Sequence, residues 1–312
     1  MRRKEKYKVD IHLLDNALAI GKQIGHTPVR LFKHPEHINI NVWAKVEWAQ
    51  LSGSVKARAA FDIIYDALSE GRLNTEIILL DATSGNTGIA YATICHQLGI
   101  RVTLCIPENA SIERKTILKR LGVEIIYTSP LEGTDGAQKI ALELASQYPG
   151  KYFYADQYKN ENNWKAHYRT TATEIMKSVP GITHFVAGLG TTGTFIGTGR
   201  GLKDSNSSIV LVALQPDSAL HGLEGWKHLE TVEAPQIYDD QLADAIEEIS
   251  TEEAYALIRS IYNSEKLLLS PSSAANLAGA FRIAERIKES IVVTILPDNA
   301  DKYSEVIKKL NL

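Results

Sequence analysis

Residues 77–88 read Ile-Ile-Leu-Leu-Asp-Ala-Thr-Ser-Gly-Asn-Thr-Gly, an apolar run that passes into a polar turn with two glycines. The apolar segment Glu76–Leu80 predicts a short β-strand, and Thr87–Leu98 predicts a helix. A turn between such a strand and helix lies at the carboxyl end of the strand, where open parallel sheets bind their ligands. This stretch therefore predicts an α/β fold whose binding loop includes Thr83–Gly88.

Strand-like and helix-like runs alternate along most of the chain. Further strands are predicted at Arg101–Ile106, Val123–Tyr127, His184–Ala187, Ile209–Leu214, Leu267–Leu269 and Ile291–Ile295. Further helices are predicted at Ala57–Leu68, Ser111–Leu121, Ala137–Gln147, Thr194–Leu202, Glu252–Tyr262 and Ala275–Ile287. Repeated strand–helix–strand units favour parallel sheets covered by helices on both faces. Gln215–Glu248 is the least regular stretch, and it predicts a long surface segment.

The composition excludes several classes of protein. The chain has 312 residues, a formal net charge of −3, 44% hydrophobic residues and 23% charged residues. These values are those of an average globular protein with two domains or one large α/β unit, rather than a disordered, collagen-like or disulfide-rich chain. A net charge near zero argues against nucleic acid as a partner. No apolar run approaches the roughly 20 residues of a membrane span, so no membrane partner is expected.

Neither the cysteines nor the histidines form a pattern that predicts chemistry. Cys95 and Cys105 suit a reducing compartment, so we expect a cytoplasmic protein in which both thiols are core residues. His34 and His37 are three residues apart, but no cysteine or acidic cluster in the sequence completes a ligand set beside them. We therefore expect no metal site.

The segment Gly188–Thr194, Gly-Leu-Gly-Thr-Thr-Gly-Thr, lies between a predicted strand and a predicted helix. Glycines allow the backbone to approach a ligand closely, and the first amides of a helix suit an anion. The segment lacks the Lys-Ser/Thr ending of a nucleotide P-loop. It matches a dinucleotide fingerprint, but no acidic residue follows about 20 residues later to hold a ribose. The segment therefore predicts a phosphate-binding loop.

Two other turns precede predicted helices. Ser52-Gly53-Ser54-Val55-Lys56 places Lys56 near the first turn of a helix, where the helix dipole disfavours a cation and eases deprotonation. A neutral lysine amine can form a Schiff base with an aldehyde. Ser270–Ser273 precedes a later predicted helix. The turn Thr83–Gly88 offers hydroxyl and amide donors without a charge, and such donors at a helix start suit a carboxylate. The alternatives are an ordinary solvated lysine and an ordinary capped helix start. The presence of all three motifs in one chain favours a site for an aldehyde, a phosphate and a carboxylate.

Together these motifs resemble the fold-type II pyridoxal-phosphate enzymes, and more narrowly the cysteine synthase (O-acetylserine sulfhydrylase) family of the B-isozyme type. Supporting stretches are Gly25–Pro28, Pro107–Arg114, Asp156–Tyr158 and Thr183–Gly188. The resemblance spans about Leu14 to Tyr303. It implies pyridoxal 5'-phosphate (PLP) as cofactor and two three-layer α/β domains with mainly parallel sheets, as in tryptophan synthase beta. Residues 45–144 would form the smaller, mobile domain, and 1–44 plus 145–312 the larger, PLP-binding domain.

The resemblance also implies a role for individual residues. Lys56 would be the Schiff-base lysine and would remove and return protons, and Asn86 would bind the phenolate oxygen of the cofactor. Ser272 would face the pyridine nitrogen. The substrate α-carboxylate would be held by Thr83, Ser84, Thr87 and Gln157. The phosphate would be bound by Gly190, Thr191, Thr192, Gly193 and Thr194.

The implied activity is replacement of the β-substituent of O-acetyl-L-serine, or a similar O-activated serine, by sulfide to give L-cysteine in a homodimeric enzyme. Ala57 replaces the usual Asp after the lysine, and Ala274 replaces a usual glycine. These departures leave open a sibling enzyme of the O-phosphoserine or cystathionine type, a dehydratase, or a weakened homologue that acts as a binding protein. The segment after Pro216 contains Lys227 but no nearby arginine, which argues against O-phosphoserine.

Overall fold

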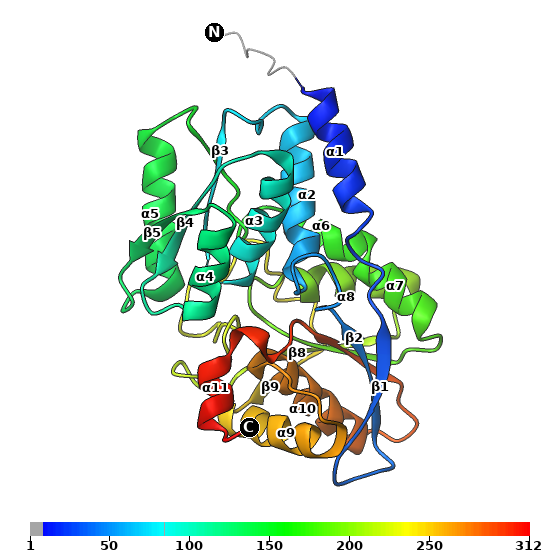
Figure 1. Ribbon diagram of the computed structural model, residues 1–312. Coiled ribbons are helices and arrows are strands. Elements are labelled where there is room, and N and C mark those ends of the chain that lie inside the picture. Colours follow the sequence, from blue (N-terminus) through cyan, green and yellow to red (C-terminus); the bar gives the residue numbers. More distant parts are fainter. Residues whose placement is uncertain (1–8, 84) are drawn as a thin grey trace. The chain divides into compact units, whose positions relative to one another are not determined.

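The computed structural model describes residues 9–83 and 85–312, which form two compact α/β units (Figure 1). The four-stranded unit comprises the described residues up to Ile24 together with Lys56–Asn162. The six-stranded unit comprises Gly25–Val55 and Asn163–Leu312. The mobile domain expected at residues 45–144 stays a prediction.

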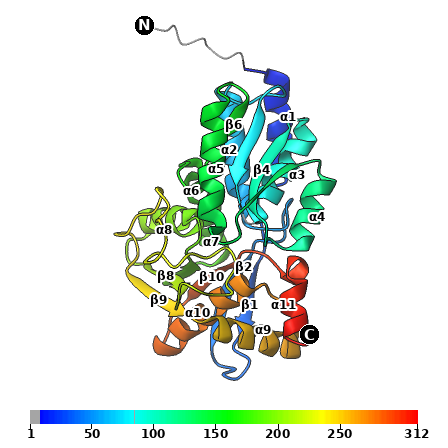
Figure 2. The ribbon, with the colours of Figure 1, turned by 90° about the vertical axis from the view of Figure 1, so that its left-hand side faces the viewer.

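The four-stranded unit has three layers around a parallel sheet of order β5-β4-β3-β6. Its strands are β3 (Ile78–Ala82), β4 (Val102–Pro107), β5 (Glu124–Thr128) and β6 (Tyr152–Tyr154). One face is covered by α5 (Gly133–Gln147), and the other by α2 (Lys56–Ser69), α3 (Asn86–Leu98) and α4 (Ile112–Arg120) (Figure 2). Helix α1 (Ile11–Gly21) packs on α2 and α3. Leu80, Ala82 and Cys105 of the sheet pack against α5 in one of its core clusters.

The six-stranded unit is built on a sheet of order β1-β2-β10-β7-β8-β9, in which only the β1–β2 pair is antiparallel. Its strands are β1 (Val29–Lys33), β2 (Asn41–Val46), β7 (His184–Gly188), β8 (Val210–Pro216), β9 (Ala245–Ile249) and β10 (Val292–Leu296). Its helices are α6 (Asn162–Arg169), α7 (Thr171–Ser178), α8 (Gly193–Ser205), α9 (Thr251–Glu265), α10 (Pro271–Arg286), the 3-10 helix η1 (Ala300–Lys302) and α11 (Ser304–Lys309).

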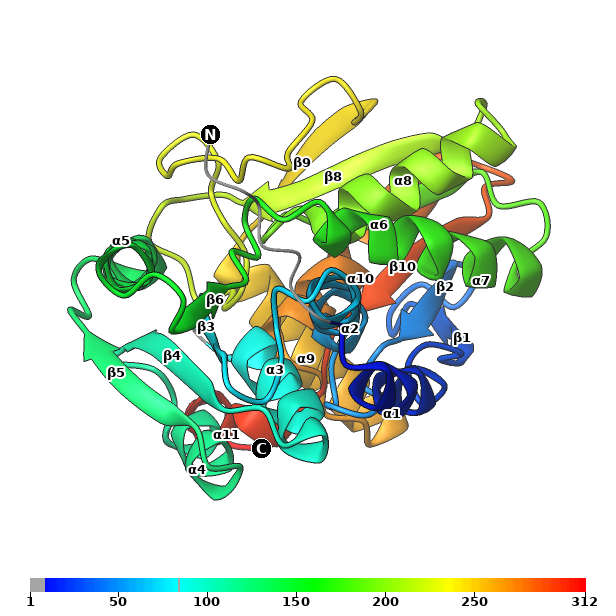
Figure 3. The same cartoon turned by 90° about the horizontal axis from the view of Figure 1, so that it is seen from above.

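Two hydrophobic clusters hold this second sheet between its helices. Val186 and Leu214 belong to a cluster with residues of α9 and α10, whereas Phe185 and Leu211 belong to a cluster with residues of α7 and α8. Figure 3 shows α8 and α10 on opposite sides of this sheet. Neighbouring strand residues thus point to opposite, buried faces, as expected for a parallel sheet covered on both sides. The predicted α/β fold with mainly parallel sheets is confirmed in both units.

Parallel pairing places the important loops at one edge of each sheet. In the six-stranded unit, the residues after β2, β7 and β10 follow carboxyl ends that share an edge. In the four-stranded unit, the residues after β3 and β6 do the same. Ligands bind at such edges, so each sheet brings candidate binding residues together from segments that are far apart in the sequence.

Two sequence predictions of local structure are wrong. Leu267–Leu269 forms no strand, and Leu269 makes only an isolated bridge to Asn299. Helix α10 begins at Pro271 rather than at Ala275, because the Ser270 side chain accepts from the Ser273 amide and proline is tolerated in the first turn. Ser270–Ser273 is therefore the start of α10, and not a turn before it.

Both cysteines are buried as predicted. Burial raises the pKa of the Cys95 thiol well above its usual value and that of Cys105 to about 12. A thiol of this kind is not a nucleophile at neutral pH. Among the described residues, no helix is long and apolar enough to cross a membrane.

Candidate active site

The loop from Thr83 to Thr87 joins β3 to α3 in the four-stranded unit. The Gly85 amide donates to Thr83 Oγ1 at 3.0 Å, and no side chain of the N-cap residue Gly85 bonds the first turn of α3. A Cβ on Gly85 would lie 2.4 Å from Cδ of Arg114, so only glycine lets this loop pack against the arginine. Since Gly85 supplies no side-chain cap, the N-terminus of α3 suits a carboxylate. Ser84 lies outside the described residues.

Gln157 reaches this loop from the end of β6. Its Nε2 donates to the main-chain oxygen of Ala82 at 2.8 Å, and its Oε1 accepts from Thr87 Oγ1 at 2.7 Å. Both side chains are buried, with Thr87 4% and Gln157 2% exposed. β3 and β6 are parallel neighbours, so Thr87 and Gln157, which are 70 positions apart in the sequence, lie in one hydrogen-bonded cluster. The structure thus brings together Thr83, Thr87 and Gln157, as predicted for the carboxylate site.

Lys56 is the first residue of α2, and the loop before it is held on the six-stranded sheet. The Val55 amide donates to the main-chain oxygen of Pro297 at 2.8 Å, directly after β10. Lys302 Nζ donates to the main-chain oxygen of Gly53 at 3.1 Å. These bonds fix the backbone that leads into the lysine.

Gln50 anchors the other end of the same loop. Its Nε2 donates to Glu47 Oε2 at 2.6 Å, and its Oε1 accepts from the Gly25 amide at 3.2 Å. Glu47 is fully buried and also accepts from Thr27 Oγ1 at 2.6 Å. Gln50 therefore links Gly25 and Glu47 on either side of the loop.

The predicted phosphate loop joins β7 to α8. Thr192 caps α8 in the left-handed conformation, with φ of 67°, and makes no side-chain bond to the first turn. Its Oγ1 is buried and has no hydrogen-bond partner in the described chain. A Cβ on Gly190 would lie 2.1 Å from the main-chain oxygen of Gly225. The loop therefore presents uncapped helix amides and a buried hydroxyl, which together suit a phosphate.

Ser272 lies in the first turn of α10 and is 5% exposed. One turn further on, Asn276 Oδ1 accepts from the Gly188 amide at 2.7 Å, where β7 passes into the phosphate loop. Asn276 therefore links the helix of Ser272 to the phosphate loop. Asn276 is not predicted from the sequence. Its only signal is an amide side chain within an otherwise apolar helical run.

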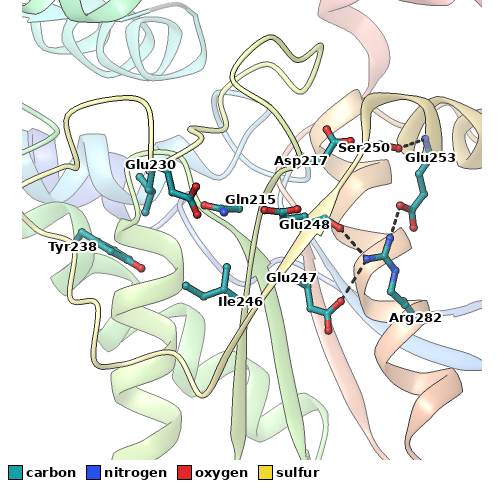
Figure 4. A pocket seen from close by; sticks show the side chains of 11 residues that line it. Gln215, Asp217, Glu230, Tyr238, Ile246, Glu247, Glu248, Ser250, Glu253 and Arg282 are labelled. Carbon is teal, nitrogen blue, oxygen red and sulfur yellow. Dashed lines mark hydrogen bonds and ion pairs between the residues drawn. The ribbon is translucent and has the colours of Figure 1, made fainter.

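An acid-lined pocket of about 800 Å³ opens beside β9 in the same unit (Figure 4). Asp217, Glu230 and Glu248 line it, and its cation Arg282 is engaged by Glu253 and by the main-chain oxygen of Glu248 at 2.8 Å. Carboxylates repel a phosphate and an amino-acid carboxylate. This pocket is therefore not the site of the predicted anions.

The structure places His34 and His37 beside Glu285, with their Nε2 atoms 3.9 and 3.7 Å from Glu285 Oε1. His34 Nδ1 accepts from the amides of Glu36 and His37, both at 3.1 Å. A neutral ring that accepts at Nδ1 carries its hydrogen on Nε2. His34 is therefore oriented to donate to the carboxylate rather than to bind a metal ion.

The profile of the pyridoxal-phosphate dependent enzyme family matches residues 20–298 of the chain. The chain belongs to this family. It is 42% identical over 293 residues to a cysteine synthase of Aquifex aeolicus (strain VF5), a match that covers 91% of this chain and 90% of that protein. It is 37% identical over 288 residues to cysteine synthase B of Escherichia coli (strain K12), covering 91% of this chain and 93% of that protein.

A solved structure supports the same assignment. The O-acetylserine dependent cystathionine beta-synthase from Helicobacter pylori matches with a TM-score of 0.85 and 34% identity, over 92% of this chain and 96% of that chain. The protein is a PLP-dependent enzyme of the cysteine synthase type with the fold-type II architecture, so the resemblance seen in the sequence is confirmed.

The residues of the six-stranded unit fit PLP. The phosphate group of PLP needs amide and hydroxyl donors, which the uncapped N-terminus of α8 and the buried hydroxyl of Thr192 supply. Ala274, on the helix of Ser272, is completely buried, as is Ala57 beside the lysine. A carboxylate at position 57 would be buried and would need a buried partner, so alanine avoids that desolvation cost. Neither departure removes a predicted cofactor contact.

Asp81 is a fully buried acid two residues before Thr83. Its Oδ1 accepts from the Ala82 amide at 2.8 Å. Burial, with a smaller contribution from the charge of Asp156, raises the pKa of Asp81 to about 7 from 3.8. Between these two pH values the folded protein holds a proton that the unfolded chain releases, so stability falls as pH rises from about 4 to about 7.

Asp81→Asn is therefore expected to stabilise the protein above pH 7 by about 2–4 kcal/mol and to change little near pH 4. The asparagine oxygen can still accept from Ala82, so the contact is kept while the charge is lost. Thermal unfolding of both proteins from pH 4 to 8 measures this. Asp15→Asn, at an exposed position of α1, is the matched control. A constant difference between D81N and the native protein at all pH values would contradict the buried charge.

Proposed function

We propose that the protein is a cysteine synthase that replaces the acetate of O-acetyl-L-serine by sulfide. The reaction consumes one O-acetyl-L-serine and one hydrogen sulfide and yields one L-cysteine and one acetic acid. The observation that carries the proposal is the buried Thr87–Gln157–Ala82 cluster at the N-terminus of α3, because it suits the carboxylate of a small amino acid. The cysteine synthase relatives support the same reaction.

In this proposal the residues divide the work of binding and proton transfer. Lys56 carries the cofactor and moves the proton at the substrate Cα. PLP supplies the electron sink that lets the β-substituent leave. Thr83, Ser84, Thr87 and Gln157 orient the substrate carboxylate, and Asn86 holds the phenolate oxygen. Gly190, Thr191, Thr192, Gly193 and Thr194 hold the phosphate, and Ser272 faces the ring nitrogen.

We further propose that residues 45–144 close over the bound amino acid, since a carboxylate held on the α3 loop can pull that segment inward and exclude water. A homodimer in the cytoplasm is proposed on the family resemblance. Sedimentation measures the oligomeric state, and hydrogen exchange within residues 45–144 should slow when the amino acid binds.

The matching Helicobacter pylori structure makes cystathionine synthesis the second candidate. The two reactions share the first substrate and differ in the nucleophile, which is sulfide or an amino-acid thiol. Competition between sulfide and homocysteine for O-acetyl-L-serine distinguishes them. We expect sulfide to have the higher kcat/KM, and a higher value for homocysteine would assign the protein to the second function.

Thr87→Val is expected to raise the KM for O-acetyl-L-serine about tenfold or more. The variant removes the hydroxyl that donates to Gln157 Oε1 and so positions Gln157 for the substrate carboxylate. A misplaced Gln157 loses a hydrogen bond to a charged group, which contributes about 1.5–3 kcal/mol. Steady-state kinetics measure the effect, with the visible absorption of the bound cofactor expected to stay unchanged. Thr87→Ser keeps the hydroxyl and is the control. An unchanged KM in T87V would contradict the carboxylate role.

A further inference from the structure

The acid-lined pocket beside β9 belongs to the six-stranded unit and has no task in the proposed reaction. It opens near the carboxyl ends of the parallel neighbours β8 and β9, at Gln215 and Glu248. Further lining comes from Leu229, Glu230 and Tyr238 of the irregular segment after β8. Its volume of about 800 Å³ is that of a small-molecule site, and open sheets bind ligands at the carboxyl ends of their strands.

Three carboxylates that line the pocket have no cation beside them. Among the described residues, none forms an ion pair with Asp217, Glu230 or Glu248, and all three residues are exposed. The lining cation, Arg282, is already engaged by Glu253. Negative charge therefore exceeds positive charge along the pocket wall, which favours a cationic ligand.

Gln215 provides an observation that is independent of the acidic residues. The residue is only 5% exposed, yet no residue of the described chain forms a hydrogen bond with its side-chain amide. Figure 4 shows this amide among the pocket side chains, between Glu230 and Glu248. A buried polar group without a partner is costly, so the amide calls for a partner inside the pocket. Its oxygen adds a neutral acceptor to the carboxylates, and a ligand rich in N–H donors satisfies both.

The carboxylates are too far apart to ligate one metal ion together. In the part of the chain that the structure describes, the one group of three potential ligand residues with atoms within 4.8 Å of one another lies elsewhere, around Glu285. Asp217, Glu230 and Glu248 therefore need an occupant that carries several positive charges at different points along its length.

The pocket also has an apolar part, formed by Leu229, Ile246 and the ring of Tyr238. Methylene groups pack on such side chains, and an ammonium group is attracted to the face of an aromatic ring. We propose that this pocket binds a linear aliphatic polyamine. Its ammonium groups donate to the Gln215 oxygen and to the separate carboxylates, and its methylene segments cover the apolar side chains.

The test is isothermal titration calorimetry of the PLP-loaded holoenzyme with spermidine, and we expect one spermidine bound per chain. Gln215→Leu should weaken binding about tenfold or more, because it removes a hydrogen bond to a charged group. Glu230→Gln and Glu248→Gln should each weaken it about two- to fivefold, as exposed ion pairs do. These two positions are exposed, so they test the site even where Q215L does not fold. Glu143→Gln, exposed on α5 in the other unit, removes the same charge and should bind spermidine like the native protein.

Two further measurements separate this site from other causes of binding. Magnesium chloride should displace spermidine no more than sodium chloride of equal ionic strength, and stronger displacement would indicate a metal site and overturn the proposal. The visible band of PLP should stay unchanged, whereas a shift that accompanies the binding heat would place the amine at the cofactor instead. Equal affinities for E143Q, E230Q and E248Q, or native affinity in folded Q215L, would also overturn the proposal, because binding would then be a diffuse attraction to an acidic surface.

Discussion

Lys56→Ala is expected to abolish cysteine formation, with a fall in rate of more than about 10³-fold. In the proposed function, the variant loses both the amine that binds the cofactor covalently and the base that moves the Cα proton. Alanine is a strong helix former and Lys56 is the first residue of α2, so the helix should still form. The rate of cysteine release measures the loss, and the visible band of lysine-bound PLP should be absent after gel filtration.

Two further variants bracket this result. Lys56→Arg keeps the positive charge but remains protonated, so it should be as inactive as K56A. Lys119→Ala, at an exposed position of α4, should behave like the native protein. Activity in K56A within tenfold of native would contradict the role of the lysine.

Gly190→Ala is expected to weaken PLP binding about 100-fold or more, because positioning errors of about 1 Å carry losses of that size. The added Cβ would lie 2.1 Å from the main-chain oxygen of Gly225. A backbone oxygen cannot rotate away as a side chain can, so the phosphate loop itself has to shift. Reconstitution of cofactor-free protein with increasing PLP, followed by its visible absorption, gives the affinity.

Gly279→Ala provides the matched control for the glycine variant. Its Cβ would lie 2.5 Å from Cδ1 of Leu214, a side-chain atom that can move, rather than from a main-chain oxygen. It should lower the thermal midpoint, since overpacking costs about 1–3 kcal/mol, but it should keep the native PLP affinity. Equal PLP affinities for G190A and G279A would show that the loop does not hold the phosphate.

The alternating pattern of the sequence predicts β3, β4, β5, β7, β8 and β10, because parallel strands are short apolar runs separated by helices. Val102–Pro107 and Val210–Pro216 illustrate this, and their observed bounds differ from the predicted ones by one or two residues. The pattern does not predict β1, β2 and β6. Edge strand β9 was assigned largely to an irregular segment, because its residues Ala245–Ile249 alternate poorly and include two exposed or partly exposed glutamates. Charged side chains on an edge strand discourage pairing with another chain, and they also obscure the apolar alternation by which a strand is recognised.

The two loops could be proposed as binding loops from the sequence because each motif is local. Gly188–Thr194 and Thr83–Gly88 combine a strand end, small residues and a helix start within a few positions. Asn276 could not be found in this way. Its partner, Gly188, is 88 residues away, and only the folded sheet brings them together.

The central claim is that O-acetyl-L-serine and sulfide are the substrates of this PLP enzyme. The most direct test follows the yellow holoenzyme during addition of O-acetyl-L-serine and then sulfide, while acetate and cysteine are quantified. We expect the visible band to shift with the first addition and return with the second, with one cysteine formed for each acetate released. An unshifted band, or acetate released without cysteine in the presence of sulfide, would contradict the claim.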